Sequence, residues 1–132
     1  MKGIDISTWQ KRINYSNLKA RGIDFAIIRC GYGRESNQKD NMFEEHYANC
    51  KNVGMKVGTY LYSYSTSIEN SEKEANNCLR FINGKTFDLP VYYDLEESTI
   101  AQYGKSYVTE MAIRFCETIK KARIKATGYM LI

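Results

Sequence analysis

Apolar and polar positions follow two patterns along this chain. Short stretches with apolar residues at every second position, or at every position, are typical of strands. These stretches cover residues 3–7, 25–31, 56–64, 91–96 and 126–132. Between them, apolar residues recur every three or four positions, which predicts amphipathic helices. The predicted helices cover residues 15–21, 42–52, 68–82 and 107–122.

The strict alternation of predicted strands and helices indicates the α/β fold class. Alternation at this spacing predicts right-handed crossovers and a parallel sheet. Two architectures have this order, an open doubly wound sheet and part of a barrel. A complete (β/α)8 barrel needs about 200 residues, and this chain has 132. In both architectures ligands bind at the carboxyl ends of the strands, so the polar residues at those ends are the ones to examine.

Acidic residues stand near the carboxyl ends of two predicted strands. Asp5 lies in the first strand, and Asp94 and Glu96 lie in the fourth, next to apolar residues. Because a strand has a period of two, Asp94 and Glu96 share one face, about 6.5–7 Å apart along the strand. In a barrel the carboxyl ends of the strands meet at one opening, the barrel mouth. Carboxylates crowded there repel one another, which raises the pKa of one of them. A protonated acid beside an ionised one is suited to cleaving a glycosidic bond.

Other interpretations of these acids stay open. Asp94 and Glu96 could cap the next helix or pair with a lysine, and acidic pairs also bind Mg²⁺ or Ca²⁺. However, no phosphate-binding loop accompanies them. The stretch 31–36 begins like GxGxxG but has Ser36 in place of the third glycine, which is weak support for a dinucleotide site. We expect no metal site and no cofactor.

Aromatic residues gather near the same strand ends. Trp9 follows the first predicted strand, Tyr32 follows the second, and Tyr60, Tyr62 and Tyr64 alternate along the third. Tyrosine favours sheets, so core packing is one explanation. The other is that these side chains line a barrel mouth, stack on sugar rings and bond to their hydroxyls. The two explanations are even for Tyr60, and sugar binding is favoured for Tyr62.

Charge, cysteine spacing and histidine count narrow the function classes. The formal net charge is +4, but lysine and arginine are scattered, so we expect no nucleic-acid partner. Cys30, Cys50, Cys78 and Cys116 lack zinc-like spacing and fall in apolar patterns. They lie on separate predicted strands and helices that we expect to face the core from different sides, so we expect reduced thiols without disulfides. The single histidine, His46, gives poor support for triads or two-histidine metal sites, and we expect it to be solvated or partly packed.

Four motifs together resemble the glycoside hydrolase family 25 lysozymes, which are N-acetylmuramidases of phages and bacteria. The motifs are GIDISTWQ (3–10), IIRCGYG (27–33), GTYLYSY (58–64) and VYYDLEE (91–97), in this order over essentially the whole chain. The resemblance implies a (β/α) barrel of the TIM-like type, here an incomplete β-α-β-α-β-α-β-α-β portion with parallel strands. It also implies hydrolysis of the β-1,4 bond between N-acetylmuramic acid and N-acetylglucosamine in peptidoglycan.

The same resemblance assigns roles to the three acids. Glu96 is expected to be the general acid that protonates the leaving oxygen. Asp94 is expected to be its partner carboxylate, which orients the acetamido group of the substrate or a water. Asp5 is expected to be a third acid at the mouth.

The resemblance also implies substrate-binding residues. Tyr62 is expected to line the sugar subsite, with Arg29 and Tyr32 close to it, and Tyr60 and Trp9 complete the set. The sequence departs from the family in its third strand, where the residue after Tyr60 is often a histidine but here is a leucine.

The family's domain continues through further strands, whereas this sequence ends at Ile132. We therefore expect residues 1–132 to be the amino-terminal portion of a catalytic domain, truncated at its carboxyl end, that self-associates through the open barrel edge. We also expect this portion to have little or no activity by itself. The alternative is a non-catalytic fragment that binds cell-wall glycan or assembles with another chain. No apolar run approaches 18 residues and no signal-peptide core is present. We expect synthesis in the cytoplasm without a signal peptide, no membrane insertion, and action on the cell wall after release.

Overall fold

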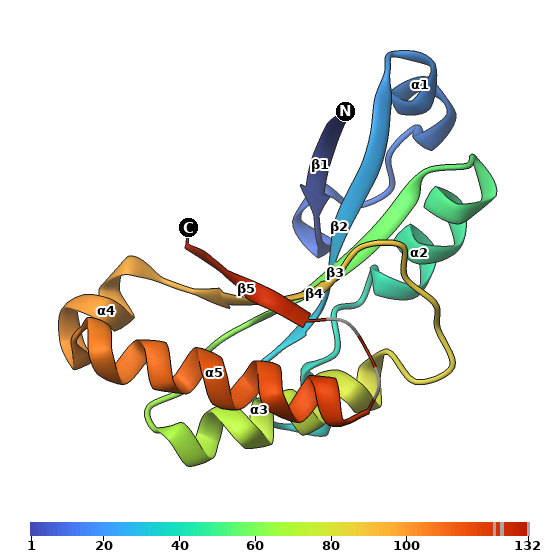
Figure 1. Cartoon of the computed structure of the whole chain (residues 1–132). Helices are drawn as coiled ribbons and strands as arrows, with labels where there is room; N and C mark the ends of the chain where they lie inside the picture. The colour runs from blue at the N-terminus through green and yellow to red at the C-terminus, as the bar shows by residue number, and fades with distance from the viewer. Residues whose placement is uncertain (123, 125, 132) are drawn as a thin grey trace.

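The computed structural model describes residues 1–122, 124 and 126–131, the last range as backbone only. Five parallel strands form one sheet in the order of the sequence. They are β1 (Lys2–Ile6), β2 (Ile23–Tyr32), β3 (Lys56–Tyr62), β4 (Val91–Leu95) and β5 (Ala126–Leu131). Figure 1 shows β1 and β5 as the two separate edges of this sheet. The carboxyl end of the last predicted strand, Ile132, lies outside the described residues.

The strand order distinguishes the two architectures that the sequence left open. A doubly wound sheet reverses its strand order at a switch point, whereas here each strand pairs with the next one along the chain. The α/β class and the parallel strands are therefore confirmed, in the order expected of consecutive barrel strands. A closed TIM barrel is not formed by the described residues, because β1 pairs only with β2 and β5 only with β4.

Five α-helices connect the strands in the described part of the chain. They are α1 (Tyr15–Ala20), α2 (Phe43–Asn52), α3 (Ile68–Phe81), α4 (Glu97–Tyr103) and α5 (Lys105–Lys121). Two single-turn 3-10 segments, η1 (Thr8–Gln10) and η2 (Ser36–Gln38), follow β1 and β2. The side chain of Asn14 caps α1 as predicted, accepting a hydrogen bond of 2.9 Å from the backbone N–H of Asn17.

The sequence pattern does not predict α4. None of its residues is fully buried, so it lacks the apolar stripe by which helices are recognised. Gly104, with φ +83°, ends α4 and directly precedes α5. This left-handed conformation suits glycine and lets the chain change direction without a loop. As a result α5 begins at Lys105, ahead of the predicted start at residue 107.

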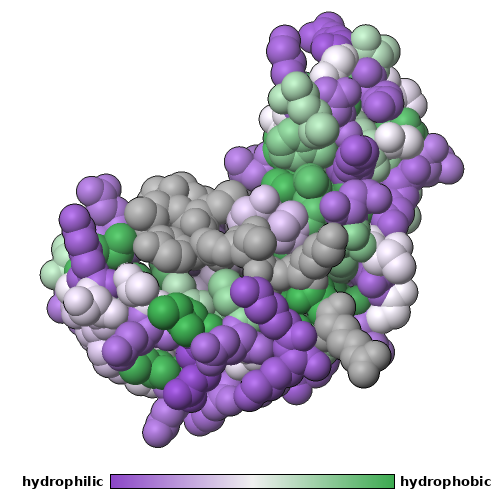
Figure 2. Space-filling model, viewed as in Figure 1, coloured by the Kyte–Doolittle hydropathy of each residue, from purple (hydrophilic) through white to green (hydrophobic). Residues whose placement is uncertain are grey.

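The two faces of the sheet carry different kinds of residue. One face packs against the helices and contributes to the core Ile6, Ala26, Ile28, Cys30, Val57, Leu61, Val91, Tyr93 and Leu95. In Figure 1, α3 and α5 pack together against one part of this face, while α1 and α2 lie at the other. Figure 2 shows that hydrophilic residues cover much of the outward surface. Alternate strand positions point to the opposite face, which corresponds to the inside of a barrel.

A bulge in β2 changes which residues reach the inner face. Arg29 pairs with Tyr60, but the next pair is Gly31 with Leu61, so Cys30 is an extra residue in β2. Strict alternation would put Tyr32 on the helix side. The bulge instead pairs Tyr32 with Tyr62. The bulged strand also passes close to α3, since a Cβ on Gly31 would lie 2.5 Å from the ring of Phe81.

All four cysteines are free thiols in this structure. The expectation that they face the core from different sides is wrong for one pair. The Sγ atoms of Cys30 and Cys78 lie 3.7 Å apart, because Cys30 is on the helix-facing side of β2 and Cys78 is on the core side of α3. Among the described helices, none is long and apolar enough to cross a membrane.

Candidate active site

The three predicted acids come from β1 and β4. Asp5 lies in β1 and is exposed, Asp94 lies in β4 and is completely buried, and Glu96 follows β4 and is half-buried. Neither carboxylate oxygen of Asp94 has a hydrogen-bond partner among the described residues. A buried carboxyl without partners is unfavourable in its charged form.

The environment of Asp94 favours its protonated form. Burial, followed by repulsion from Glu96 and Asp5, raises the pKa of Asp94 to about 7, and the Arg29 guanidinium opposes the rise. These interactions place all three acids and Arg29 in one electrostatic cluster. The sequence argument attributed a retained proton to crowding of the acids, whereas at Asp94 burial raises the pKa more than the neighbouring carboxylates do.

Tyr62 and Tyr60 stand beside the acids on β3. Tyr62 pairs with Asp94 in the sheet, and burial, followed by the nearby Glu96, raises the pKa of Tyr62. Tyr60 pairs with Arg29 on one side and Tyr92 on the other. Only 6% of Tyr60 is exposed, and burial raises its pKa. Tyr62 is thus the more accessible of the two tyrosines.

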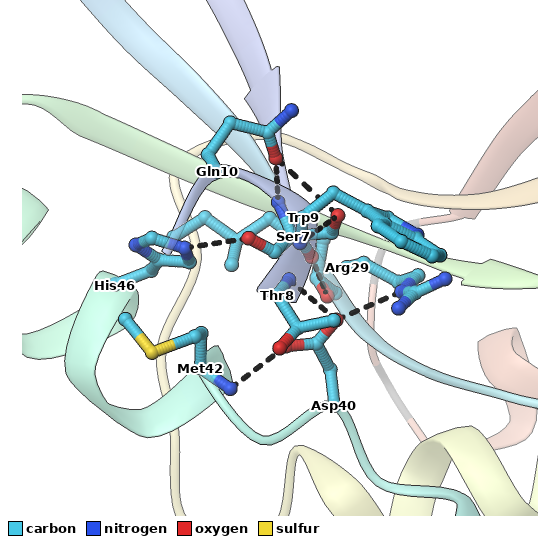
Figure 3. Close-up of polar contacts among 10 residues, drawn as sticks. Ser7, Thr8, Trp9, Gln10, Arg29, Asp40, Met42 and His46 are labelled. Carbon is cyan, nitrogen blue, oxygen red and sulfur yellow. Dashed lines mark hydrogen bonds and ion pairs between the residues drawn. The ribbon is translucent and has the colours of Figure 1, made fainter. Parts of the chain in front are cut away.

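Arg29 is held by a residue that sequence reasoning missed. Asp40, after η2, has a fully buried side chain whose Oδ2 accepts from Arg29 Nε at 2.8 Å and from the Thr8 backbone N–H at 3.0 Å. Its Oδ1 accepts from the backbone N–H of Met42 at 2.8 Å. Figure 3 shows these three bonds converging on Asp40. Asp40 therefore joins the turn after β1, the end of β2 and the start of α2.

The turn that carries Trp9 is fixed from below. The Ser7 hydroxyl accepts from the Trp9 backbone N–H at 3.2 Å, and the Gln10 side chain accepts from the Ser7 backbone N–H at 2.7 Å. His46 Nε2 lies 2.9 Å from the Ser7 carbonyl oxygen, and its Nδ1 lies 2.7 Å from the Tyr15 hydroxyl. The expectation that His46 is solvated or partly packed is wrong, because it is completely buried beneath this turn (Figure 3).

Trp9 and Tyr32 line a hollow next to the acids. The hollow has a volume of about 400 Å³ and is lined by Thr8, Trp9, Arg29, Tyr32, Asn37, Lys39, Asp40, Asn41 and Tyr64. The Arg29 guanidinium lies 5.5 Å from the centre of the Tyr32 ring. Trp9 is 79% exposed, and its ring lies on the same side of the cluster as Arg29 in Figure 3.

The predicted residues therefore form two connected groups. Asp5, Asp94, Glu96, Tyr60 and Tyr62 make the acid group, and Trp9 and Tyr32 line the hollow. Arg29 belongs to both groups. Ring contacts also join the two groups. The centre of the Tyr64 ring lies 5.2 Å from the centre of the Tyr62 ring and 5.9 Å from that of the Tyr32 ring. Within the described residues no group of three histidine, cysteine or acidic side chains could hold a metal ion.

Parallel strands with acids and aromatic rings at their carboxyl ends define an α/β protein with a paired-carboxylate site of the kind found in glycoside hydrolases. The sequence model of glycosyl hydrolases family 25 matches residues 4–130, and the chain belongs to that family. The resemblance inferred from the four sequence motifs is thereby confirmed.

Individual relatives agree with this family. Lysozyme M1 of Streptomyces globisporus is 40% identical over 63 residues, 48% of this chain and 21% of that protein. The autolytic lysozyme of Clostridium acetobutylicum is 28% identical over 96 residues, 73% of this chain and 28% of that protein. The catalytic domain of endolysin ply40 from bacteriophage P40 of Listeria monocytogenes has a similar structure, with TM-score 0.81 and 27% identity. That similarity covers 99% of this chain and 64% of the other. The matched segments therefore cover less than a third of the length of either curated relative.

Proposed function

We propose that this protein is a peptidoglycan hydrolase, a muramidase that cleaves the β-1,4 bond between N-acetylmuramic acid and N-acetylglucosamine. Family membership supports the reaction class. The observation that carries the proposal is the buried Asp94 beside Glu96 and Asp5, with the pKa of Asp94 raised to about 7. Such a cluster holds a proton at the pH where it must be delivered to a glycosidic oxygen.

In this proposal Asp94 and Glu96 act together on the glycosidic bond. Glu96 is half-buried and can reach a substrate at the mouth, so it passes the proton to the leaving oxygen. Asp94, which is buried, balances the charge of the pair and orients the acetamido group or a water from behind. Asp5 keeps the local field negative, which favours positive charge on the sugar in the transition state.

In this proposal the glycan is bound by aromatic side chains, those of Trp9, Tyr32 and Tyr62, and by Arg29. The Tyr62 hydroxyl orients Glu96, and the rings of Trp9 and Tyr32 offer apolar faces to sugars along the hollow. Tyr60, being nearly buried, supports Arg29 and Tyr62 from the inner face. The substrate lies in the bacterial cell wall, so the protein works there after its release. Residues 1–132 belong to one catalytic domain.

The test compares Glu96→Gln with the unaltered protein on purified peptidoglycan, measuring reducing ends released. Glutamine keeps the shape but has no proton to transfer, so we expect the rate to fall by about 10² to 10⁴. Glu97→Gln is the matched control, because Glu97 is the exposed neighbour in α4. Circular dichroism checks that all three proteins fold. A Glu96→Gln rate within a few-fold of the control would remove Glu96 from this role, and binding without cleavage by the unaltered protein would contradict the hydrolase.

We also propose self-association through the open sheet. In the described residues β1 and β5 each leave one edge unpaired, and such edges favour pairing with another chain. Light scattering at micromolar concentration should give a mass above 15.3 kDa. A monomeric mass at every concentration would contradict it.

A further inference from the structure

A buried glutamate lies behind the site and has no part in the proposed chemistry. Glu74, in α3, is 1% exposed. Its Oε1 accepts from the hydroxyls of Ser63 at 2.8 Å and Tyr93 at 2.5 Å, and its Oε2 accepts from the backbone N–H of Tyr64 at 2.8 Å. Burial raises the pKa of Glu74, and these hydrogen bonds oppose the rise.

The partners of Glu74 are the neighbours of site residues. Ser63 and Tyr64 follow Tyr62 at the end of β3, and Tyr93 precedes Asp94 in β4. The Ser63 backbone N–H donates to the Asp94 carbonyl at 2.9 Å. Because β3 ends at Tyr62, the Tyr64 backbone lies beyond the strand, and the carboxylate from α3 supplies the partner for its N–H. Hydrogen bonds to a charged group are among the stronger ones in proteins.

Tyr64 is an exposed aromatic residue next to the site. Its side chain is 64% exposed although two other rings contact it. It lines the hollow that contains Trp9 and also a second hollow of about 330 Å³. The second hollow is otherwise lined by Gly33, Arg34, Glu35, Gln38, Ser65, Thr66, Asn70 and Glu74. Tyr64 therefore lines both hollows and leaves much of its side chain exposed, as expected for a residue that stacks on a carbohydrate.

We propose that Glu74 is a positioning residue for glycan binding, which holds the Tyr64 ring between the two hollows so that this ring stacks on a sugar of the substrate. The inference rests on the proposed function for the identity of the glycan. It assigns to Tyr64 direct contact with the substrate and to Glu74 an action through Tyr64 alone.

Glycan binding is measured with soluble peptidoglycan fragments in the Glu96→Gln background, which prevents cleavage. Trp9 is the single tryptophan and lines the same hollow as Tyr64, so its fluorescence reports binding. We expect Tyr64→Ala to weaken binding about 3- to 10-fold, the size of one lost aromatic contact. Glu74→Ala should weaken it similarly. Glu69→Gln, an exposed glutamate of the same helix, is the control and should bind as the parent does.

The double variant distinguishes positioning from general stability. If Glu74 acts through Tyr64, then Glu74→Ala weakens binding no further once Tyr64 is alanine. Glu74→Gln should restore binding to within about twofold, because its amide oxygen can still accept from Tyr64 while the hydroxyls of Ser63 and Tyr93 turn to accept. With Glu96 restored, cleavage by the Glu74→Ala variant should show a raised KM and an unchanged kcat.

Several outcomes would overturn the inference. The first is that Glu74→Ala binds the fragments as tightly as the Glu69→Gln control does. The second is that the losses of affinity caused by Tyr64→Ala and Glu74→Ala multiply in the double variant. The third is that the parent protein does not bind the fragments. If Glu74→Ala fails to fold by circular dichroism, Glu74→Asp replaces it, since the shorter side chain withdraws its oxygen from Tyr64. Binding without cleavage by the unaltered protein would contradict the proposed function and leave this inference standing.

Discussion

Replacing Asp94 by asparagine should stabilise the fold above neutral pH. Asparagine has nearly the same shape and stays neutral, whereas Asp94 is completely buried and must ionise there without a hydrogen-bond partner among the described residues. Its pKa rises from 3.8 to about 7, which corresponds to about 4 kcal/mol between folded and unfolded states. We expect the same substitution to abolish glycan cleavage, so that the site gains function at the expense of stability.

The sign of the pH dependence follows from the raised pKa. Between pH 3.8 and about 7 the folded state holds the Asp94 proton and the unfolded state does not, so stability falls as pH rises. Above about pH 7 both states are ionised and the loss is complete. From pH 5 to pH 8 the unaltered protein should lose about 3 kcal/mol through this group, and Asp94→Asn should not lose it.

Urea unfolding at pH 5, 6, 7 and 8 measures this difference for the unaltered protein, Asp94→Asn and a control, Glu110→Gln, in which an exposed side chain of α5 changes. Comparing the two proteins at each pH cancels the contributions of the other titrating groups, which both proteins share. It also cancels any fixed cost of burying the amide. The reasoning is refuted if the stability difference between Asp94→Asn and the unaltered protein stays constant from pH 5 to pH 8.

Two further predictions concern Asp40 and the four cysteines. Asp40→Asn should destabilise the fold by about 1.5–3 kcal/mol, because it removes the charged partner of Arg29. It should also lower the fluorescence anisotropy of Trp9, whose turn Asp40 anchors; unchanged anisotropy would contradict that anchoring. Thiol titration in denaturant without reductant should find four free thiols. Finding two free thiols, together with a disulfide-linked Cys30–Cys78 peptide in mass spectrometry, would contradict this and show that the pair oxidises.

The alternation of strands and helices along the chain and the face that carries the acids could be predicted, because both depend on short-range periodicity, whereas the order of the strands within the sheet could not. A period of two in 91–96 places Asp94 and Glu96 on one face without knowledge of any other strand. A period near 3.6 identifies α2, α3 and α5 in the same way. The position of Tyr32 could not be predicted, because the bulge at Cys30 reverses the alternation and leaves no mark in the sequence.

Two buried polar residues could have been found from the helix patterns. Glu74 lies on the inward stripe of α3, one residue before Ala75 and four before Cys78. His46 lies on the inward stripe of α2 between Phe43 and Cys50. A polar residue on an apolar stripe signals a buried partner, since burying it unpaired is costly. The identity of the partner could not be predicted, because Ser7 and Tyr64 come from other parts of the chain.

Three buried polar residues, here called supports, hold parts of the chain near the site through hydrogen bonds, and Asp94 differs from them. His46 holds the Ser7 carbonyl after β1, Asp40 holds Arg29 in β2, and Glu74 holds the Tyr64 N–H after β3. Each support is well bonded, so each fixes the loop that follows its strand. Asp94 has no such bond among the described residues. Hydrogen bonds to a carboxylate favour its charged form, and at Glu74 they oppose the effect of burial on the pKa. At Asp94 no described hydrogen bond opposes burial, and the pKa rises to about 7. In the proposed function this lets Asp94 hold a proton near neutral pH, while the bonded groups keep the surrounding chain rigid.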